Sequence, residues 1–187
     1  MTAATVRRCF FDTSVLLYSL DDAEPEKQQI VSQWVSTVWE AGIGAISWQV
    51  LNEFYVNGRR KLKKPAPILR FIVEIYSEWQ PIGFQLGLLQ RAWHWCDHAD
   101  LNYWDALILA SAEALGCRWL LSEDFQEGRR YGTVEVVNPF RTAPAKFFPA
   151  SNQGATTIAR TRLPQQSRPG PLETRRLRSA PPSVPPE

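Results

Sequence analysis

The sequence predicts an α/β fold in which helices cover both faces of a short parallel sheet. Short apolar runs alternate with longer segments in which apolar residues recur at helical spacing, and this order is typical of strands alternating with amphipathic helices. The chain has 187 residues, of which 44% are hydrophobic, enough for one domain with a sizeable core. Together these observations favour a three-layer α/β/α sandwich.

The first strand and the first long helix have clear boundary signals. Residues 6–11 form an apolar, β-branched and aromatic run that predicts a buried strand ending at Asp12. Residues 24–40 carry apolar side chains at helical spacing, with Pro25 near the start and Gly42 just beyond the end. We therefore expect a strand, a connection and a helix that packs by one face.

A second strand and helix follow directly. The run 43–47 predicts a short strand, and Ser47 is a favourable N-cap for a helix over 48–57. Glu53 then falls in the second turn of that helix. We expect the helix to start at the same edge of the sheet at which Asp12 lies.

Two further amphipathic helices are predicted over 66–79 and 85–98. The apolar spacing places Ile68 and Ile75 on the inward face of the first helix. It places Trp93 on the inward face of the second.

The last part of the domain repeats the alternation. Asn102 predicts the N-cap of a helix, with Asp105 three residues later and Gly116 as its terminating residue. Strands are then predicted over 118–122 and 134–138. The first of these strands ends beside an acidic pair, Glu123 and Asp124.

In four segments, carboxylates thus lie just after the end of a strand or near the start of a helix. Ligands bind at the carboxyl ends of parallel strands, so Asp12, Glu53, Asp105, Glu123 and Asp124 are expected at one rim. Like charges held close together raise one another's pKa, and a cation removes that cost. Oxygen ligands without His or Cys favour Mg²⁺ or Mn²⁺ over zinc. The pattern predicts a divalent metal site.

Each acid also has a purely structural interpretation. Asp12 can close a turn at the end of its strand, and Asp105 can be the capping-box partner of Asn102. Glu53 can be an ordinary exposed helix residue, and the acidic pair can be loop residues. These alternatives remain open for each residue taken singly, but together they explain the common pattern less well.

Four segments resemble the acidic motifs of PIN-domain ribonucleases, in particular the toxins of VapBC-type toxin–antitoxin pairs. The segments read FFDTSVLLY, SWQVLNEFY, LNYWDALILASAEALGC and LLSEDFQEG, and the resemblance covers about residues 6–140. It implies a PIN-like α/β/α sandwich and Mg²⁺- or Mn²⁺-dependent endonucleolytic cleavage of RNA. It also implies four catalytic acids, Asp12, Glu53, Asp105 and Asp124.

The residue types suggest how such a site would work. Without a His, Cys or Lys placed as nucleophile, hydrolysis of a phosphodiester would use metal-activated water. Asp12, Asp105 and Asp124 are the expected metal ligands, with Glu53 completing the shell and Glu123 as a possible accessory acid. By the resemblance, the protein is expected to be a toxin whose acidic pocket is occluded by a small antitoxin.

A basic run lies just beyond the helix that carries Glu53. Its five cations are candidate RNA contacts: Arg59, Arg60, Lys61, Lys63 and Lys64. Cations also favour helix C-termini, and charge runs are often solvated loops, so these explanations compete. Aromatic residues such as Tyr18 and Trp104 flank the acidic motifs and can stack unpaired bases. Eight tryptophans also suggest a homodimer, whose interface would cover surplus aromatic surface.

Composition divides the chain at residue 140. Residues 1–140 hold 13 basic and 17 acidic side chains, a net charge of −4, whereas residues 141–187 have a net charge of +6 and 9 of the 14 prolines. We expect a nuclease domain over 1–140 and a disordered Pro/Arg-rich tail over 141–187. The tail could bind RNA, bind a partner or lack a function. Three unpaired cysteines and the lack of a long apolar run predict a cytoplasmic protein without a membrane span.

Other functional classes stay open. A receiver-type signalling domain also accepts phosphate on an aspartate at a strand end, but the expected Lys is missing from RWLLSEDF. A PIN-like fold without catalysis would serve as a binding scaffold. A zinc site at His94 and His98 lacks a third ligand at metal-binding spacing.

Overall fold

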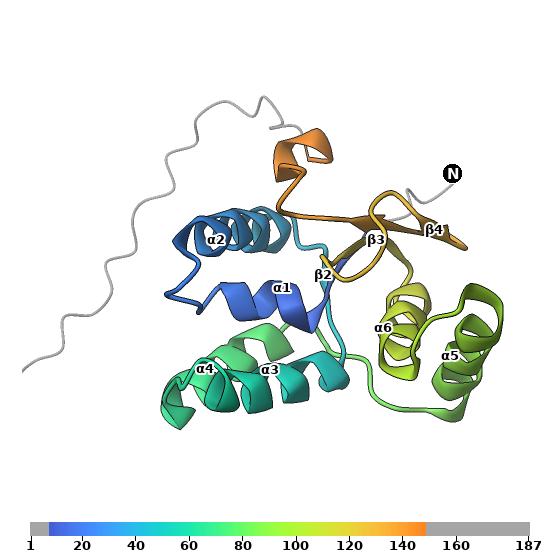
Figure 1. Cartoon of the computed structure of the whole chain (residues 1–187), viewed down its shortest axis with the longest axis horizontal. Coiled ribbons are helices and arrows are strands. Elements are labelled where there is room, and N and C mark those ends of the chain that lie inside the picture. Colours follow the sequence, from blue (N-terminus) through green and yellow to red (C-terminus); the bar gives the residue numbers. More distant parts are fainter. Residues whose placement is uncertain (1–7, 149–187) are drawn as a thin grey trace, which may run out of the picture. The chain divides into compact units, whose positions relative to one another are not determined.

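The computed structural model describes residues 8–148, and a five-stranded sheet is its centre. The strand order is β2-β1-β3-β5-β4 (Figure 1). The strands are β1 (Arg8–Phe11), β2 (Gly44–Ala45), β3 (Cys117–Leu121), β4 (Arg130–Tyr131) and β5 (Val134–Val137). β2, β1, β3 and β5 are parallel, whereas β4 pairs antiparallel with β5. The predicted parallel sheet is confirmed, with one short antiparallel edge strand added.

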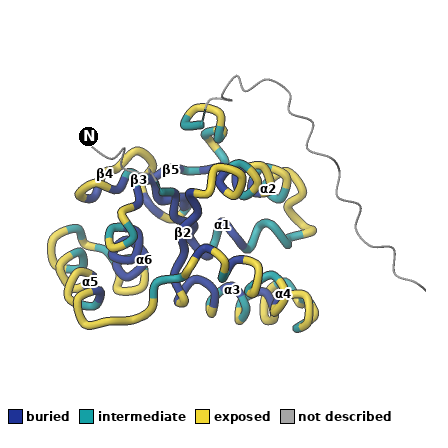
Figure 2. The backbone as a smooth tube through the Cα atoms, turned by 180° about the vertical axis from the view of Figure 1, so that it is seen from behind, coloured by how far each residue is buried: buried dark blue, intermediate teal, exposed yellow. Residues whose placement is uncertain are grey.

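Helices lie on both sides of this sheet. They are α1 (Thr13–Tyr18), α2 (Pro25–Glu40), α3 (Trp48–Arg60), α4 (Ala66–Ser77), α5 (Leu86–Ala99), α6 (Tyr103–Ala114) and the 3-10 helix η1 (Pro144–Lys146). Figures 1 and 2 show α5 and α6 on one side of the central strands and α1, α2 and α4 on the other. The α/β/α sandwich is therefore confirmed. Within residues 8–148, no helix combines the length and apolar character needed to span a bilayer.

The helix starts follow from short polar side chains. Ser47 caps α3 by accepting a hydrogen bond from the Val50 N–H, and Asn102 caps α6 in the same way. Gly116 has φ +66°, a left-handed conformation that ends α6 without a Cβ penalty. The six-residue helix α1 was not predicted, because so short a segment has no clear periodicity.

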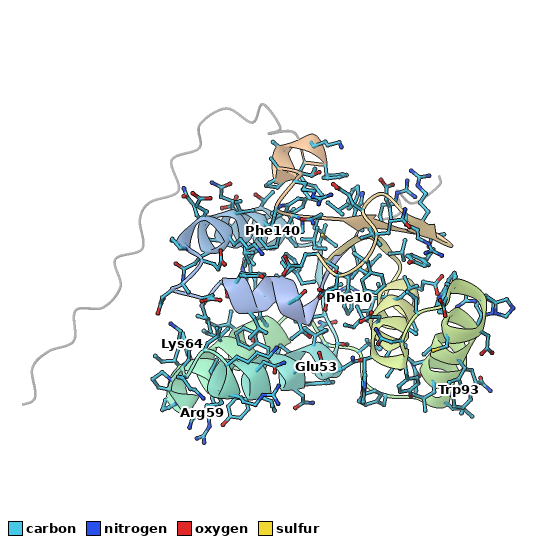
Figure 3. All side chains as sticks on the ribbon, viewed as in Figure 1. Phe10, Glu53, Arg59, Lys64, Trp93 and Phe140 are labelled. Atoms are coloured by element: carbon cyan, nitrogen blue, oxygen red, sulfur yellow. The ribbon has the colours of Figure 1, made fainter. Side chains whose placement is uncertain are left out.

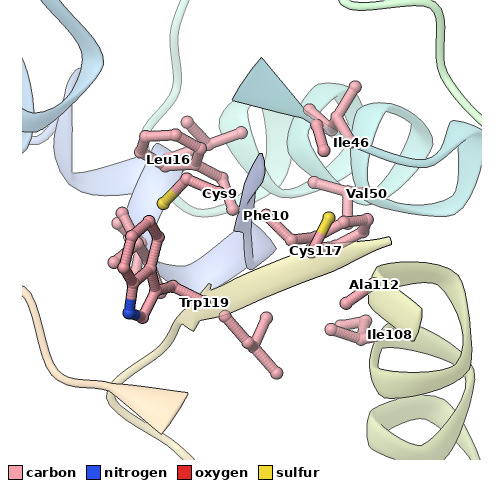
Figure 4. Close-up of a cluster of buried hydrophobic side chains, with 14 of the residues drawn as sticks. Cys9, Phe10, Leu16, Ile46, Val50, Ile108, Ala112, Cys117 and Trp119 are labelled. Atoms are coloured by element: carbon pink, nitrogen blue, oxygen red, sulfur yellow. The ribbon is translucent and has the colours of Figure 1, made fainter. Parts of the chain in front are cut away.

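The core is formed by the sheet and the helix faces that pack on it. The central strands and α6 are among the most buried parts of the chain, as Figure 2 shows. Figure 4 shows a cluster in which Phe10 of β1 and Trp119 of β3 lie among side chains from α1, α3 and α6. Because β1 and β3 are central strands with apolar side chains on both faces, their carboxyl ends are held rigidly.

Three side chains predicted to face the core are exposed. Ile68 and Ile75 on α4 are 47% and 36% exposed, and Trp93 on α5 is 49% exposed. Figure 3 shows Trp93 on the outer side of α5. The buried faces are narrower than the apolar pattern suggested: α4 packs through Leu69, close to Gly58 of α3 where a Cβ would clash with it.

The described chain continues in contact with the core past residue 140. Phe147 and Phe148 pack against Trp34 of α2 and Trp119 of β3. The Trp34 indole N–H donates to carbonyl oxygens of residues 139 and 142. The remainder of the predicted tail, from residue 149, lies outside the described residues.

Candidate active site

Asp12 is the most buried acid of the site. It directly follows β1, where its backbone N–H donates to the Leu121 carbonyl of β3, and it is the N-cap of α1. Its carboxylate accepts hydrogen bonds of 2.6 Å from both the Thr13 N–H and the Ser122 hydroxyl. The predicted turn contact is therefore present. The side chain is also almost fully enclosed, because the residue is only 4% exposed.

This environment shifts the acidity of Asp12 strongly. Burial raises the pKa of the carboxyl from its ordinary value of 3.8 to about 7. The hydrogen bonds from Ser122 and Thr13 lower the pKa, while the negative charges of Asp124 and Asp105 raise it. The structure thus brings Asp105 and Asp124 close enough to Asp12 for their charges to interact.

Glu53 lies in the second turn of α3 with both carboxylate oxygens bonded. The Thr13 hydroxyl donates to Oε2 at 2.8 Å, and the Gln49 amide donates to Oε1 at 3.0 Å. Gln49 also donates to the Trp104 carbonyl at the start of α6, at 3.4 Å. Glu53 is thereby fixed next to the start of α1, in the position labelled in Figure 3.

Gln49 has one unusual feature. It is 6% exposed, and its Oε1 has no hydrogen-bond donor among the described residues. Its amide nitrogen faces two acceptors, which fixes the orientation of the amide group. A buried acceptor without a donor is costly, so this oxygen offers a bonding position beside the acids.

Asp105 lies in the first turn of α6 and is half-buried. The Asn102 side-chain amide donates to Oδ2 at 2.5 Å, so the capping contact expected from the sequence is present. Burial raises the pKa of Asp105, the Asn102 hydrogen bond lowers it, and the charges of Asp124 and Glu53 raise it. Asp105 is therefore both a capping partner and a member of the acidic group.

The two acids after β3 have different surroundings. Asp124 is exposed, and its backbone N–H donates to the Ser122 hydroxyl. Glu123 forms a 2.9 Å ion pair with Lys27, which also donates to the Tyr18 hydroxyl at 2.8 Å. The charge of Glu123 is balanced within the protein, whereas that of Asp124 acts on Asp12 and Asp105.

The donor set fits Mg²⁺ or Mn²⁺ in its chemistry. Asp12, Glu53, Asp105 and Asp124 offer only oxygen, the ligand these cations prefer. In residues 8–148, no three His, Cys, Asp or Glu side chains are grouped tightly enough to hold an ion as they lie. Burial is the main cause of the raised pKa values of Asp12 and Asp105, and the neighbouring carboxylates raise them further. A bound cation would offset both effects.

The basic run lies at the far end of α3 from Glu53. Figure 3 shows Arg59 and Lys64 at that end. Lys64 is paired with Asp22 at 2.5 Å, and Arg59 donates to the Lys64 carbonyl. Arg60 reaches Asn57 of its own helix. Of the five predicted RNA contacts, three thus have local partners that support the structural interpretation as well.

Three polar residues of the site were not singled out from the sequence. Ser122 bridges Asp12 and the Asp124 backbone, Thr13 bonds Glu53, and Gln49 links Glu53 to α6. The helical i, i+4 spacing of Gln49 and Glu53 was a usable signal. The Ser122 contact depends on the pairing of β1 with β3, which no local pattern gives.

Comparison with known proteins agrees with this arrangement. No curated protein matches the chain. The model of the PIN domain family matches residues 9–129, which include every acid of the site. The chain therefore belongs to the PIN domain family.

Proposed function

We propose that this protein is a Mg²⁺- or Mn²⁺-dependent endoribonuclease and the toxin of a VapBC-type toxin–antitoxin pair. PIN domains are typically nucleases. The observation that carries the proposal is that four acids converge: the charges of Asp124 and Asp105 act on Asp12, and those of Asp124 and Glu53 act on Asp105. Four separate elements deliver these charges, an arrangement that is costly without a cation.

The roles we propose follow from the contacts. Asp12, Asp105 and Asp124 would be the metal ligands, and Glu53 would complete the catalytic set. Ser122 and Thr13 hold the Asp12 carboxylate, and Thr13 and Gln49 hold that of Glu53. When bound, the cation supplies charge neutralisation for the phosphodiester and lowers the pKa of water.

The same proposal assigns partners. RNA would contact the basic run, Arg59, Arg60, Lys61, Lys63 and Lys64, and an antitoxin would cover the acidic pocket. Exposed aromatic side chains such as Phe71, Trp93 and Trp104 support protein partners, including a second copy of the chain. We also propose that the protein acts in the cytoplasm, and that residues 141–187 take no part in the chemistry.

Cleavage assays with and without metal test the proposal. Purified protein should cut single-stranded RNA in Mg²⁺ or Mn²⁺, and EDTA should abolish the cleavage, because the site offers only oxygen ligands. Restoring excess Mg²⁺ should restore it. Cleavage that persists in EDTA would refute the metal mechanism. RNA binding without cleavage in any divalent metal would instead support a catalytically silent scaffold.

A further inference from the structure

A cavity of about 310 Å³ adjoins the acidic site. Its lining comes from α1, from the end of α3 and from the loop after β3, and Figure 1 shows α1 between α2 and the α3–α4 pair. Ser14 and Asp124 belong to this lining. The Ser14 hydroxyl donates to the Asp12 carboxylate at 3.4 Å, so the cavity begins where the proposed metal ligands lie.

The walls combine apolar and acceptor groups. Leu17 and Leu62 provide apolar surface, and Asp21 and Glu123 provide carboxylates. Among the described residues, hydrogen bonds occupy Oδ1 of Asp21, from the Ala23 N–H, and Oε2 of Glu123, from Lys27. The Tyr18 hydroxyl also lies within hydrogen-bonding reach of the Glu123 carboxylate. Oδ2 of Asp21 therefore remains as an acceptor for a molecule in the cavity.

Lys61 is the cation of this cavity. Of the residues that line it, Lys61 alone is positively charged. The neighbouring Arg59, Arg60 and Lys64 have the local partners described above, whereas no hydrogen bond or ion pair within residues 8–148 involves the Lys61 ammonium. The Lys61 ammonium thus has no bonded partner among the described residues, in a cavity whose other charged groups are Asp21, Glu123 and Asp124.

We propose that this cavity binds one nucleotide of single-stranded RNA next to the cleaved phosphodiester. The proposal rests on the proposed ribonuclease function and adds a binding subsite to it. Small-molecule sites range from about 300 to 1000 Å³, and a single nucleotide suits the lower end. The base packs on Leu17 and Leu62, and Lys61 binds a phosphate.

The Asp21 carboxylate gives this subsite a base preference. Asp and Glu accept hydrogen bonds from exocyclic amino groups such as N4 of cytosine. Uracil presents a carbonyl oxygen at the same position, and that oxygen is repelled by a carboxylate. The cavity therefore selects bases with an amino group on the pairing edge over uracil.

The test compares CMP and UMP, which differ at this position and carry the same phosphate. Binding to the full chain is followed by NMR chemical shifts, in Mg²⁺ and again in EDTA. CMP should bind several-fold more tightly than UMP in both conditions, with shifts at Leu17 and Leu62. Equal binding of the two nucleotides, or shifts confined to other parts of the protein, would overturn the proposal.

Two variants separate the contributions. Asp21→Asn keeps the acceptor for the Ala23 N–H and should remove the preference for CMP. Lys61→Gln should weaken the binding of both nucleotides by roughly tenfold, which is the scale of one charged hydrogen bond. Arg70→Gln, which makes the same charge change at an exposed position on α4 outside the cavity, should have no effect. Equal weakening by the Lys61 and Arg70 variants would contradict a specific phosphate contact.

The outcomes distinguish this proposal from the proposed function. Selective CMP binding by a protein that never cuts RNA would support the subsite and refute the ribonuclease. EDTA-sensitive cleavage without selective CMP binding would refute the subsite alone. If either variant does not fold, the comparison of CMP with UMP on the unaltered chain still decides.

Discussion

The site has two inner carboxylates, Asp12 and Glu53, and two outer carboxylates, Asp105 and Asp124. The two pairs are held in different ways. Asp12 and Glu53 are fixed by hydrogen bonds from Ser122, Thr13 and Gln49, which come from three different parts of the fold. The outer acids are looser: Asp124 is exposed, and Asp105 is bonded on one oxygen by its own helix cap. The inner carboxylates are thus preorganised by the fold, whereas the outer carboxylates have fewer contacts that would restrict them when a ligand binds.

The cost of burying charge explains why the site has both buried and exposed carboxylates. A buried charge is costly, and burial accordingly raises the pKa of Asp12. Exposed charges cost less, but their position is less certain. One buried, well-bonded acid together with outer acids that have fewer contacts would combine a fixed ligand with the adjustment that metal coordination requires.

Replacing Asp12, the buried acid, should have the largest effect on cleavage activity. Asp12→Asn should lose more cleavage activity than the roughly 10- to 100-fold typical of residues that only orient a metal ligand. The unfolding free energy at neutral pH should not fall, because the substitution removes a buried charge. Cleavage rates and thermal melts of the two proteins measure both effects. Asp97→Asn, at an exposed position on α5, is the matched control.

The same variant tests the sign of the pH dependence. The folded Asp12 retains its proton up to a pKa of about 7, whereas the unfolded chain loses it near 3.8. Without metal, this group should therefore lower wild-type stability as pH rises between these values, and it should add no further change above pH 7. The decline should be smaller in Asp12→Asn. An identical pH profile for both proteins would show that Asp12 does not titrate in this window.

Removing the Ser122 hydroxyl, which orients Asp12, should reduce activity less than replacing Asp12 itself. Ser122→Ala removes the hydroxyl bonded to Asp12 and should reduce activity or metal affinity roughly 10- to 100-fold. Ser111→Ala deletes an equally buried hydroxyl that bonds within α6, so it controls for the loss of a buried hydrogen bond. Equal activity loss in the two variants would contradict a specific role for Ser122.

The corresponding contact on the outer side should have the smallest effect on activity. Asn102→Ala removes the cap of α6 and should cost about 0.5–2 kcal/mol of stability. Activity should fall less than in Ser122→Ala, because Asp105 can adjust. Chemical denaturation and cleavage rates supply the two numbers. A larger loss of activity in the Asn102 variant would reverse the proposed difference between the two sides.

The sequence predicted the elements of this site better than its contacts. The strand ending at Asp12 and the caps at Ser47 and Asn102 have local signals, and parallel pairing explains why their acids converge. The bond from Ser122 to Asp12 joins residues 110 positions apart and depends on the register of β1 with β3. The exposure of Trp93 was missed for a related reason. Periodicity identifies the apolar face of a helix, but it does not show how much of that face the neighbouring elements cover.

Metal-dependent melting of wild type and Asp105→Asn tests the central claim, that these acids form a cation site. Without metal, the variant should be at least as stable as wild type, because it loses repulsion from Asp124 and Glu53. Mg²⁺ or Mn²⁺ should stabilise wild type, by about 2.7 kcal/mol at a hundredfold excess over Kd, and should stabilise the variant much less. A variant that loses up to about 1 kcal/mol without metal and gains as much from metal as wild type would show that Asp105 is only a helix cap.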